Sequence, residues 1–109
     1  MTIIVTRNAS GRIRGFLASC MAEIAPGVYT APRMNVRVRE RVWTVVGEWF
    51  EPQREMAVVM TWPDRSKNCG QSVRSLGVPA VELVEYSGVY LARRETGRTD
   101  GANDGAGTA

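Results

Sequence analysis

Residues 2–25, TIIVTRNASGRIRGFLASCMAEIA, contain the pattern on which the fold prediction rests. The β-branched run from Thr2 to Arg7 is short enough to be a strand buried on both faces. A turn follows, in which Ser10 can cap a helix. The apolar residues of 12–25 recur at helical spacing, and they are Ile13, Phe16, Leu17, Cys20, Met21 and Ile24. This stripe predicts an amphipathic helix from Arg12 to Ala25, stopped by the Pro-Gly that follows.

A second helix is expected after Asn35, whose side chain can act as its N-cap. Its inner stripe is expected to be Val38, Val42, Val45, Val46 and Trp49. Its outer face is expected to carry Arg37, Arg41, Thr44 and Glu48. Further strands are expected at Val28–Ala31, at Met56–Trp62 and, from weaker patterns, at residues 71–76 and Val89–Ala92.

This order of elements predicts an α+β fold of ferredoxin-like βαββαβ type. It would have a four-stranded antiparallel sheet with two helices on one face and an extra C-terminal strand. Residues 1–94 would form the domain, and residues 95–109, rich in Gly, Asp, Asn and Ala, a disordered tail. The uncovered face of such a sheet needs a partner, so we expect a homodimer.

Length and composition exclude several classes of protein. The 109 residues allow one domain. The sequence has no histidine, which excludes Ser-His-Asp and Cys-His catalysis and zinc sites with histidine ligands. Cys20 and Cys69 form no CxxC motif and give no reason to infer a metal site or a disulfide. Without an apolar run of about 18 residues or a signal peptide, the protein is expected to be cytoplasmic and not in a membrane.

Basic charge is concentrated in the first part of the chain. Residues 1–41 carry a net charge of +5, and residues 42–109 carry −2. Arg12 and Arg14 fall in the first turn of the first helix, where cations oppose the helix dipole and phosphate would be favoured. The second helix adds Arg37, Arg39 and Arg41, of which Arg37 and Arg41 repel unless an anion or Glu40 relieves them. The candidate contacts to nucleic-acid phosphates are therefore Arg12, Arg14, Arg37, Arg39 and, less strongly, Arg74. The alternative is an ordinary solvated basic surface.

Catalytic residues are only weakly indicated. Asp64 follows the third strand and Glu82 lies further along, and together they could hold Mg²⁺ or Mn²⁺ for phosphodiester hydrolysis. No pair of carboxylates has a convincing spacing, however, and surface solubility also explains them. The aromatic residues do not alternate along an exposed strand, so contact with a duplex backbone is preferred to base stacking.

Several segments, in order and spacing, resemble one family. They are Thr6-Arg7-Asn8, Arg12-Ile13-Arg14-Gly15, Gly27-Val28-Tyr29, Arg37-Val38-Arg39-Glu40 with Trp43, Val58-Val59-Met60 with Trp62, Leu76-Gly77 and Gly88-Val89-Tyr90-Leu91. Over residues 1–93 the chain is similar to the Cas-two family, the small non-integrase subunit of CRISPR spacer acquisition. It resembles especially the branch that accompanies Cascade-type (I-E) systems.

The resemblance implies a ferredoxin-like homodimer that bridges two dimers of the Cas-one integrase and supports the duplex DNA prespacer through its backbone. It implies phosphate contacts at Arg12, Arg14, Arg37 and Arg39, and integrase docking through Val89, Tyr90, Leu91 and Ala92. Family members are often described as metal-dependent endoribonucleases with an acid at the end of the first strand. Here that position is Arg7, which would repel Mg²⁺, and a shifted alignment would offer only the neutral amide of Asn8.

Three hypotheses follow from the sequence. The first is a non-catalytic scaffold for duplex DNA, and the second is a Mg²⁺- or Mn²⁺-dependent endonuclease acting on RNA or DNA, with Asn8 and Asp64 as candidate catalytic residues. The third is a small ligand-binding module of the same fold. No cofactor is expected unless the nuclease hypothesis holds.

Overall fold

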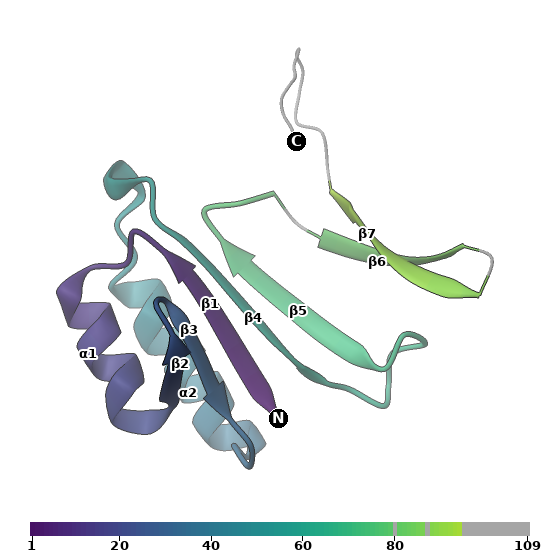
Figure 1. Ribbon diagram of the computed structural model, residues 1–109, viewed down its shortest axis with the longest axis horizontal. Coiled ribbons are helices and arrows are strands. Elements are labelled where there is room, and N and C mark those ends of the chain that lie inside the picture. Colours follow the sequence, from purple (N-terminus) through teal and green to yellow (C-terminus); the bar gives the residue numbers. More distant parts are fainter. Residues whose placement is uncertain (80, 87, 95–109) are drawn as a thin grey trace. The chain divides into compact units, whose positions relative to one another are not determined.

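The computed structural model describes residues 1–79, 81–86 and 88–94, which form two units, Met1–Val78 and a second that begins at Pro79 (Figure 1). In chain order the elements are β1 (Thr2–Arg7), α1 (Gly11–Cys20), β2 (Ala22–Ala25), β3 (Val28–Ala31), α2 (Val36–Glu48), the 3₁₀ turn η1 (Pro52–Arg54), β4 (Ala57–Pro63), β5 (Gln71–Leu76), β6 (Val81–Tyr86) and β7 (Val89–Arg94). The α+β fold predicted from the sequence is confirmed.

The first unit is built on one antiparallel sheet with the strand order β2-β3-β1-β4-β5. Its first four strands have the ferredoxin-like order, and β5 adds a fifth strand at the free edge of β4. The central strand β1 places Ile4 opposite Tyr29 of β3 on one side and opposite Met60 of β4 on the other. Because side chains alternate across a strand, these three residues share one face of the sheet.

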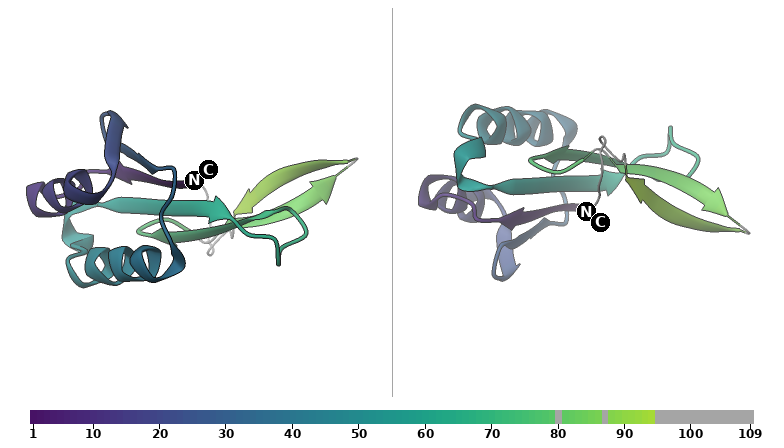
Figure 2. Two further views of the ribbon diagram at one scale, coloured as in Figure 1. Left: turned by 90° about the horizontal axis from the view of Figure 1, so that it is seen from below. Right: turned by 90° about the horizontal axis from the view of Figure 1, so that it is seen from above.

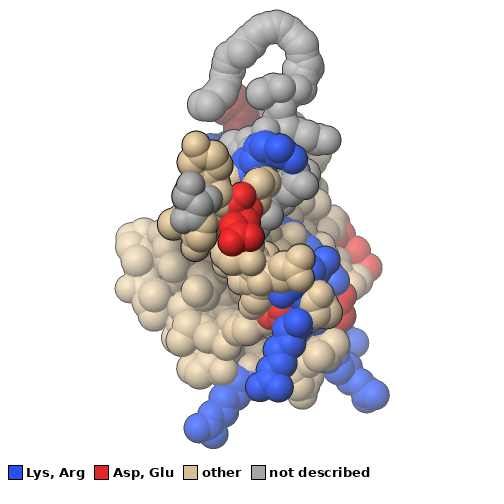
Figure 3. Space-filling view, turned by 90° about the vertical axis from the view of Figure 1, so that its right-hand side faces the viewer, with Lys and Arg blue, Asp and Glu red and all other residues tan. Residues whose placement is uncertain are grey.

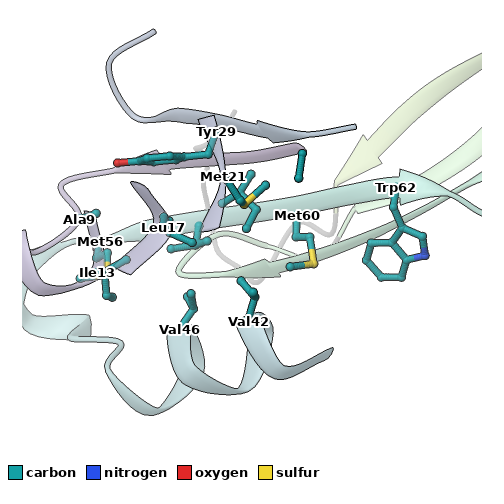
Figure 4. Packing of buried hydrophobic residues seen from close by; sticks show 13 residues of the cluster. Ala9, Ile13, Leu17, Met21, Tyr29, Val42, Val46, Met56, Met60 and Trp62 are labelled. Atoms are coloured by element: carbon teal, nitrogen blue, oxygen red, sulfur yellow. The ribbon is translucent and has the colours of Figure 1, made fainter. Parts of the chain in front are cut away.

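That face carries the hydrophobic core, and both helices pack against it (Figure 4). Ile13 and Leu17 of α1 and Val46 of α2 are completely buried, as are Ile4 and Met60 of the sheet. The helix caps follow from the sequence. Ser10 accepts a hydrogen bond from the backbone N–H of Ile13, and Asn35 accepts one from that of Val38.

The prediction of a helix from Arg12 to Ala25 is wrong over its last five residues. Helix α1 ends at Cys20, because Met21 turns to an extended conformation while its N–H still donates to Leu17. Residues Ala22–Ala25 instead form β2, which pairs with β3 across a turn at Gly27, where φ is +77°. The apolar stripe that packs into the core therefore ends at Met21, just after the helix, and the side chain of Ile24 is 66% exposed.

Two expectations about burial also need correction. The first strand is buried on one face only, since Val5 on the face away from the helices is 45% exposed. In α2 the inner stripe is narrower than expected. Val42 and Val46 are buried, but Val38, in the first turn of the helix, is 41% exposed.

The face of the sheet away from the helices is open and largely apolar. As the strand registers place them, its side chains include Ile3, Val5, Val28, Thr30, Val59, Thr61 and Val73, together with the polar side chains of Arg7, Gln71 and Ser75. In Figure 2 both helices lie away from this face of β1 and β4. An antiparallel sheet whose free face met only water would be expected to carry polar side chains there.

The second unit is a hairpin in which β6 and β7 pair from Val81 opposite Arg94 to Tyr86 opposite Val89. The strand expected at Val89–Ala92 is therefore present and extends to Arg94, and its partner is β6, a strand that the sequence reading did not predict. The expected tail of residues 95–109 lies outside the described residues.

Candidate nucleic-acid interface

Arg12 stacks on the indole ring of Trp49. Its guanidinium lies 3.8 Å from the ring centroid of Trp49, the C-cap residue that follows α2. Phe16, one turn further along α1, meets the same indole edge to face, with ring centroids 5.6 Å apart. A cation over an indole face is attracted by the ring quadrupole, which offsets the cost of a positive charge in the first turn of a helix. The stack fixes the side chain, while the guanidinium N–H groups can still donate to an anion.

Arg14 points in another direction, because side chains two residues apart on a helix diverge by about 200°. It comes near β3, where its charge acts on Tyr29. Burial, followed by the charge of Glu23, raises the pKa of Tyr29, and Arg14 opposes that rise. One nitrogen of Arg14 lies 4.0 Å from the place that a Cβ on Gly11 would take. Among the described residues, neither Arg12 nor Arg14 forms an ion pair.

Arg39 and Arg74 come together at a second position, where α2 crosses β4 and β5. Their guanidinium carbons lie 4.1 Å and 5.0 Å from the ring centroid of Trp62, which is 8% exposed. Glu40 joins the two arginines. One oxygen accepts a hydrogen bond from Arg74 at 2.7 Å, and the other lies 3.4 Å from Arg39. We call these four residues the Trp62 cluster.

Both arginines lower the pKa of Glu40. The hydrogen bond from Arg74 is the largest influence and lowers the pKa of Glu40, partial burial opposes it, and Arg39 lowers the pKa further. Glu40 therefore does not relieve the repulsion between Arg37 and Arg41, as the sequence had suggested it could. Its carboxylate turns towards the sheet instead.

The outer face of α2 keeps its positive charge. Arg37 and Arg41 are exposed on it, and Arg33 is exposed in the segment before the helix. Within the described residues none of the three has a carboxylate within ion-pair distance. Figure 3 shows several basic side chains that extend into solvent at the lower edge of the face in view.

The structure thus divides the predicted arginines between two positions. Arg12 is anchored at Trp49, at the C-terminal end of α2, whereas Arg39 lies near the start of that helix. Ten residues of α-helix separate Arg39 from Trp49, a distance of roughly 15 Å. The sequence reading found the arginines but missed the contacts of Trp49, Trp62 and Glu40 with them, because residues 12 to 37 positions apart in the chain leave no local pattern.

Asp64 organises the loop between β4 and β5. One of its oxygens accepts hydrogen bonds from the backbone N–H of Ser66 at 2.9 Å and from its hydroxyl at 2.6 Å, and the other accepts one from the Ser72 hydroxyl. These bonds, led by the one from the Ser66 hydroxyl, lower the pKa of Asp64 from 3.8 to about 2. Both oxygens are therefore engaged, one by the loop and the other by the start of β5.

Replacing Asp64 with asparagine should lower the stability of the fold in a pH-dependent way. Because the folded pKa of about 2 lies below the ordinary value of 3.8, ionised Asp64 stabilises the fold above pH 3.8. This contribution is lost as the pH falls towards 2. The difference in urea midpoint between wild type and Asp64→Asn should shrink over that range. Ser72→Ala should give a smaller loss with the same trend. A difference that stayed constant from pH 6 to pH 2 would contradict this role.

Of the candidate metal ligands, Asn8 and Asp64 lie at opposite ends of β4. Asn8 follows β1 at the end of the sheet where Ala57 begins β4, and Asp64 follows Pro63 at the other end of β4. Seven residues of strand place them roughly 20 Å apart. The Asn8 amide donates to the backbone oxygen of Glu55 at 3.4 Å. The side chain of Glu82 lies outside the described residues. Where side chains are described, no three His, Cys, Asp or Glu residues are grouped to hold a metal ion.

The hairpin displays apolar side chains. Tyr86, Val89, Tyr90 and Leu91 are 43% to 70% exposed, and Ala92 is also exposed. Large apolar residues close together on a surface mark a site of protein interaction more often than isolated ones do. No helix of the described chain is long and apolar enough to cross a membrane.

The chain matches the family model described as CRISPR-associated protein (Cas_Cas2CT1978) over residues 1–91. The match covers the first unit and most of the hairpin. It agrees with the Cas-two resemblance seen in the sequence, while the assignment to the I-E branch stays a prediction.

Proposed function

Because the chain belongs to this family of CRISPR-associated, Cas-two-like proteins, we propose that it is an adaptation protein of the I-E type that binds the backbone of duplex prespacer DNA and bridges integrase dimers. The observation that carries the proposal is the set of basic side chains at the start of α1 and along α2 that have no acidic partner among the described residues. Arginine forks match phosphate oxygens and stay charged at all working pH values.

The direct experiment is a salt titration of DNA binding with two duplexes of equal length and unrelated sequence. Backbone contacts predict equal affinities for both duplexes and a steep loss of affinity with salt, because binding releases the cations condensed on DNA. A strong preference for one duplex, or binding that salt does not weaken, would contradict the proposal.

The open face of the sheet supports the proposal of a homodimer. Ile3, Val5, Val59 and Val73 form an apolar surface that a second copy of the chain can cover by twofold symmetry. The exposed apolar residues of the hairpin, Val89 to Ala92, are the proposed contact to the Cas-one integrase.

Val5→Glu should convert the dimer to a monomer, because it places a charge in the centre of the apolar face. Light scattering should then give a mass of 12.0 kDa instead of twice that value. The matched control is Val36→Glu, which adds the same charge at a residue that is 62% exposed in the first turn of α2. A Val5→Glu protein that stayed dimeric would place the interface elsewhere.

No specific observation favours the endonuclease hypothesis. Arg7 stands at the end of β1, Asp64 is engaged by Ser66 and Ser72, and Asn8 lies at the opposite end of β4. The described donors do not fit a Mg²⁺ or Mn²⁺ ion, so we propose no catalytic step.

A further inference from the structure

In the Trp62 cluster a single carboxylate stands between two arginines. Each oxygen of Glu40 faces a different guanidinium, at 2.7 Å from Arg74 and 3.4 Å from Arg39. Two anionic oxygens on one centre, each meeting its own guanidinium, are also what a phosphodiester group offers. Arginine binds carboxylates and phosphates through the same N–H donors.

We propose that the Arg39–Arg74 pair is a binding site for a backbone phosphate and that the Glu40 carboxylate occupies this site in the free protein. The inference rests on the proposed function, since the ligand is the phosphate of a nucleic-acid duplex. When DNA binds, a backbone phosphate replaces the Glu40 carboxylate between the two arginines. Glu40 therefore sets the affinity of this site by competing with the DNA.

The burial of the four side chains suits such an exchange. Glu40 is the most exposed of the charged members, at 42%, so it can swing into solvent without disturbing the core. Arg39 is only 14% exposed and rests on Trp62, so it keeps its position when the carboxylate leaves. Arg74 is 37% exposed and can reach a phosphate directly. The net charge of the cluster is +1 with Glu40 in place and +2 once it has swung out.

Glu40→Gln tests the competition. The amide has the shape of the carboxylate, and its oxygen can still accept from Arg74, so the fold is expected to persist. Without the competing charge, duplex binding should strengthen roughly three- to tenfold near 100 mM salt. In the wild type the released carboxylate takes up a cation, which offsets part of the cation release from DNA. A plot of the logarithm of the binding constant against the logarithm of the salt concentration should therefore be steeper for the variant, by up to about one unit of slope for each protomer.

Two controls separate competition from a general change in charge. Glu48→Gln removes the same charge from the same helix, outside the cluster, and should change affinity less than twofold. Arg74→Ala in the Glu40→Gln background should abolish the gain. The inference is overturned if Glu40→Gln behaves like Glu48→Gln, if its gain survives Arg74→Ala, or if it lowers stability without raising affinity. Wild-type protein that bound no duplex would overturn the proposed function and the inference together. Normal wild-type binding with no effect of Glu40→Gln would overturn the inference alone.

Discussion

Replacing Gly77 with alanine is expected to destabilise the fold by about 3 kcal/mol, from a strained backbone and an overlap that must be relieved. Gly77 follows β5 with φ of +79°, a conformation that residues with a Cβ rarely adopt. An added Cβ would overlap the carbonyl oxygen of Met56 and lie 3.0 Å from the ring of Phe50. The backbone before β4 would have to move.

Gly70 provides a matched control for this prediction. Its φ is +80°, almost the same, but a Cβ there would meet nothing within 4 Å. Gly70→Ala should therefore cost only the backbone strain, about 1 kcal/mol. Urea unfolding followed by tryptophan fluorescence measures both variants. Equal losses at the two glycines would show that the close approach to Met56 does not matter.

The double variant Arg12→Ala, Arg14→Ala is expected to weaken duplex binding at least tenfold near 100 mM salt. A dimer loses four guanidinium groups. The slope of the logarithm of the binding constant against the logarithm of the salt concentration should fall by about one unit for each phosphate contact removed. The loss should be the same for every duplex sequence, because these contacts would be to the backbone. Arg12 should contribute through its fixed position on Trp49 as well as through its charge.

A control variant removes two positive charges from the loop between β4 and β5. Arg65 and Lys67 are exposed in the loop between β4 and β5, and replacing both with alanine changes the net charge by the same amount. If the interface is at the start of α1, this loop variant should lose much less affinity. Equal losses in the two double variants would mean that overall charge, and not these arginines, governs binding.

Local signals in the sequence predicted both helices and most of the strands. The caps Ser10 and Asn35 are confirmed because each acts within three residues of its own position. The strand β2 was missed because its residues continue the apolar helical spacing, and only pairing with β3 decides their structure. Periodicity cannot distinguish these two outcomes over four residues.

The site was predicted less completely. Clustering of charge identified Arg12, Arg14, Arg37 and Arg39, but not their surroundings. Arg12 meets Trp49 from 37 residues away, and Glu40 meets Arg74 from 34 residues away. Such contacts depend on how the helices cross the sheet, which the sequence reading did not specify.

The most direct test of the account is light-scattering chromatography of this protein with the integrase of its own CRISPR locus, with and without duplex DNA. We expect the protein alone to elute as a dimer. We also expect both proteins to elute together in a larger complex, which the duplex strengthens. A protein whose elution and mass stay unchanged in the presence of integrase and duplex would contradict the proposed scaffold role.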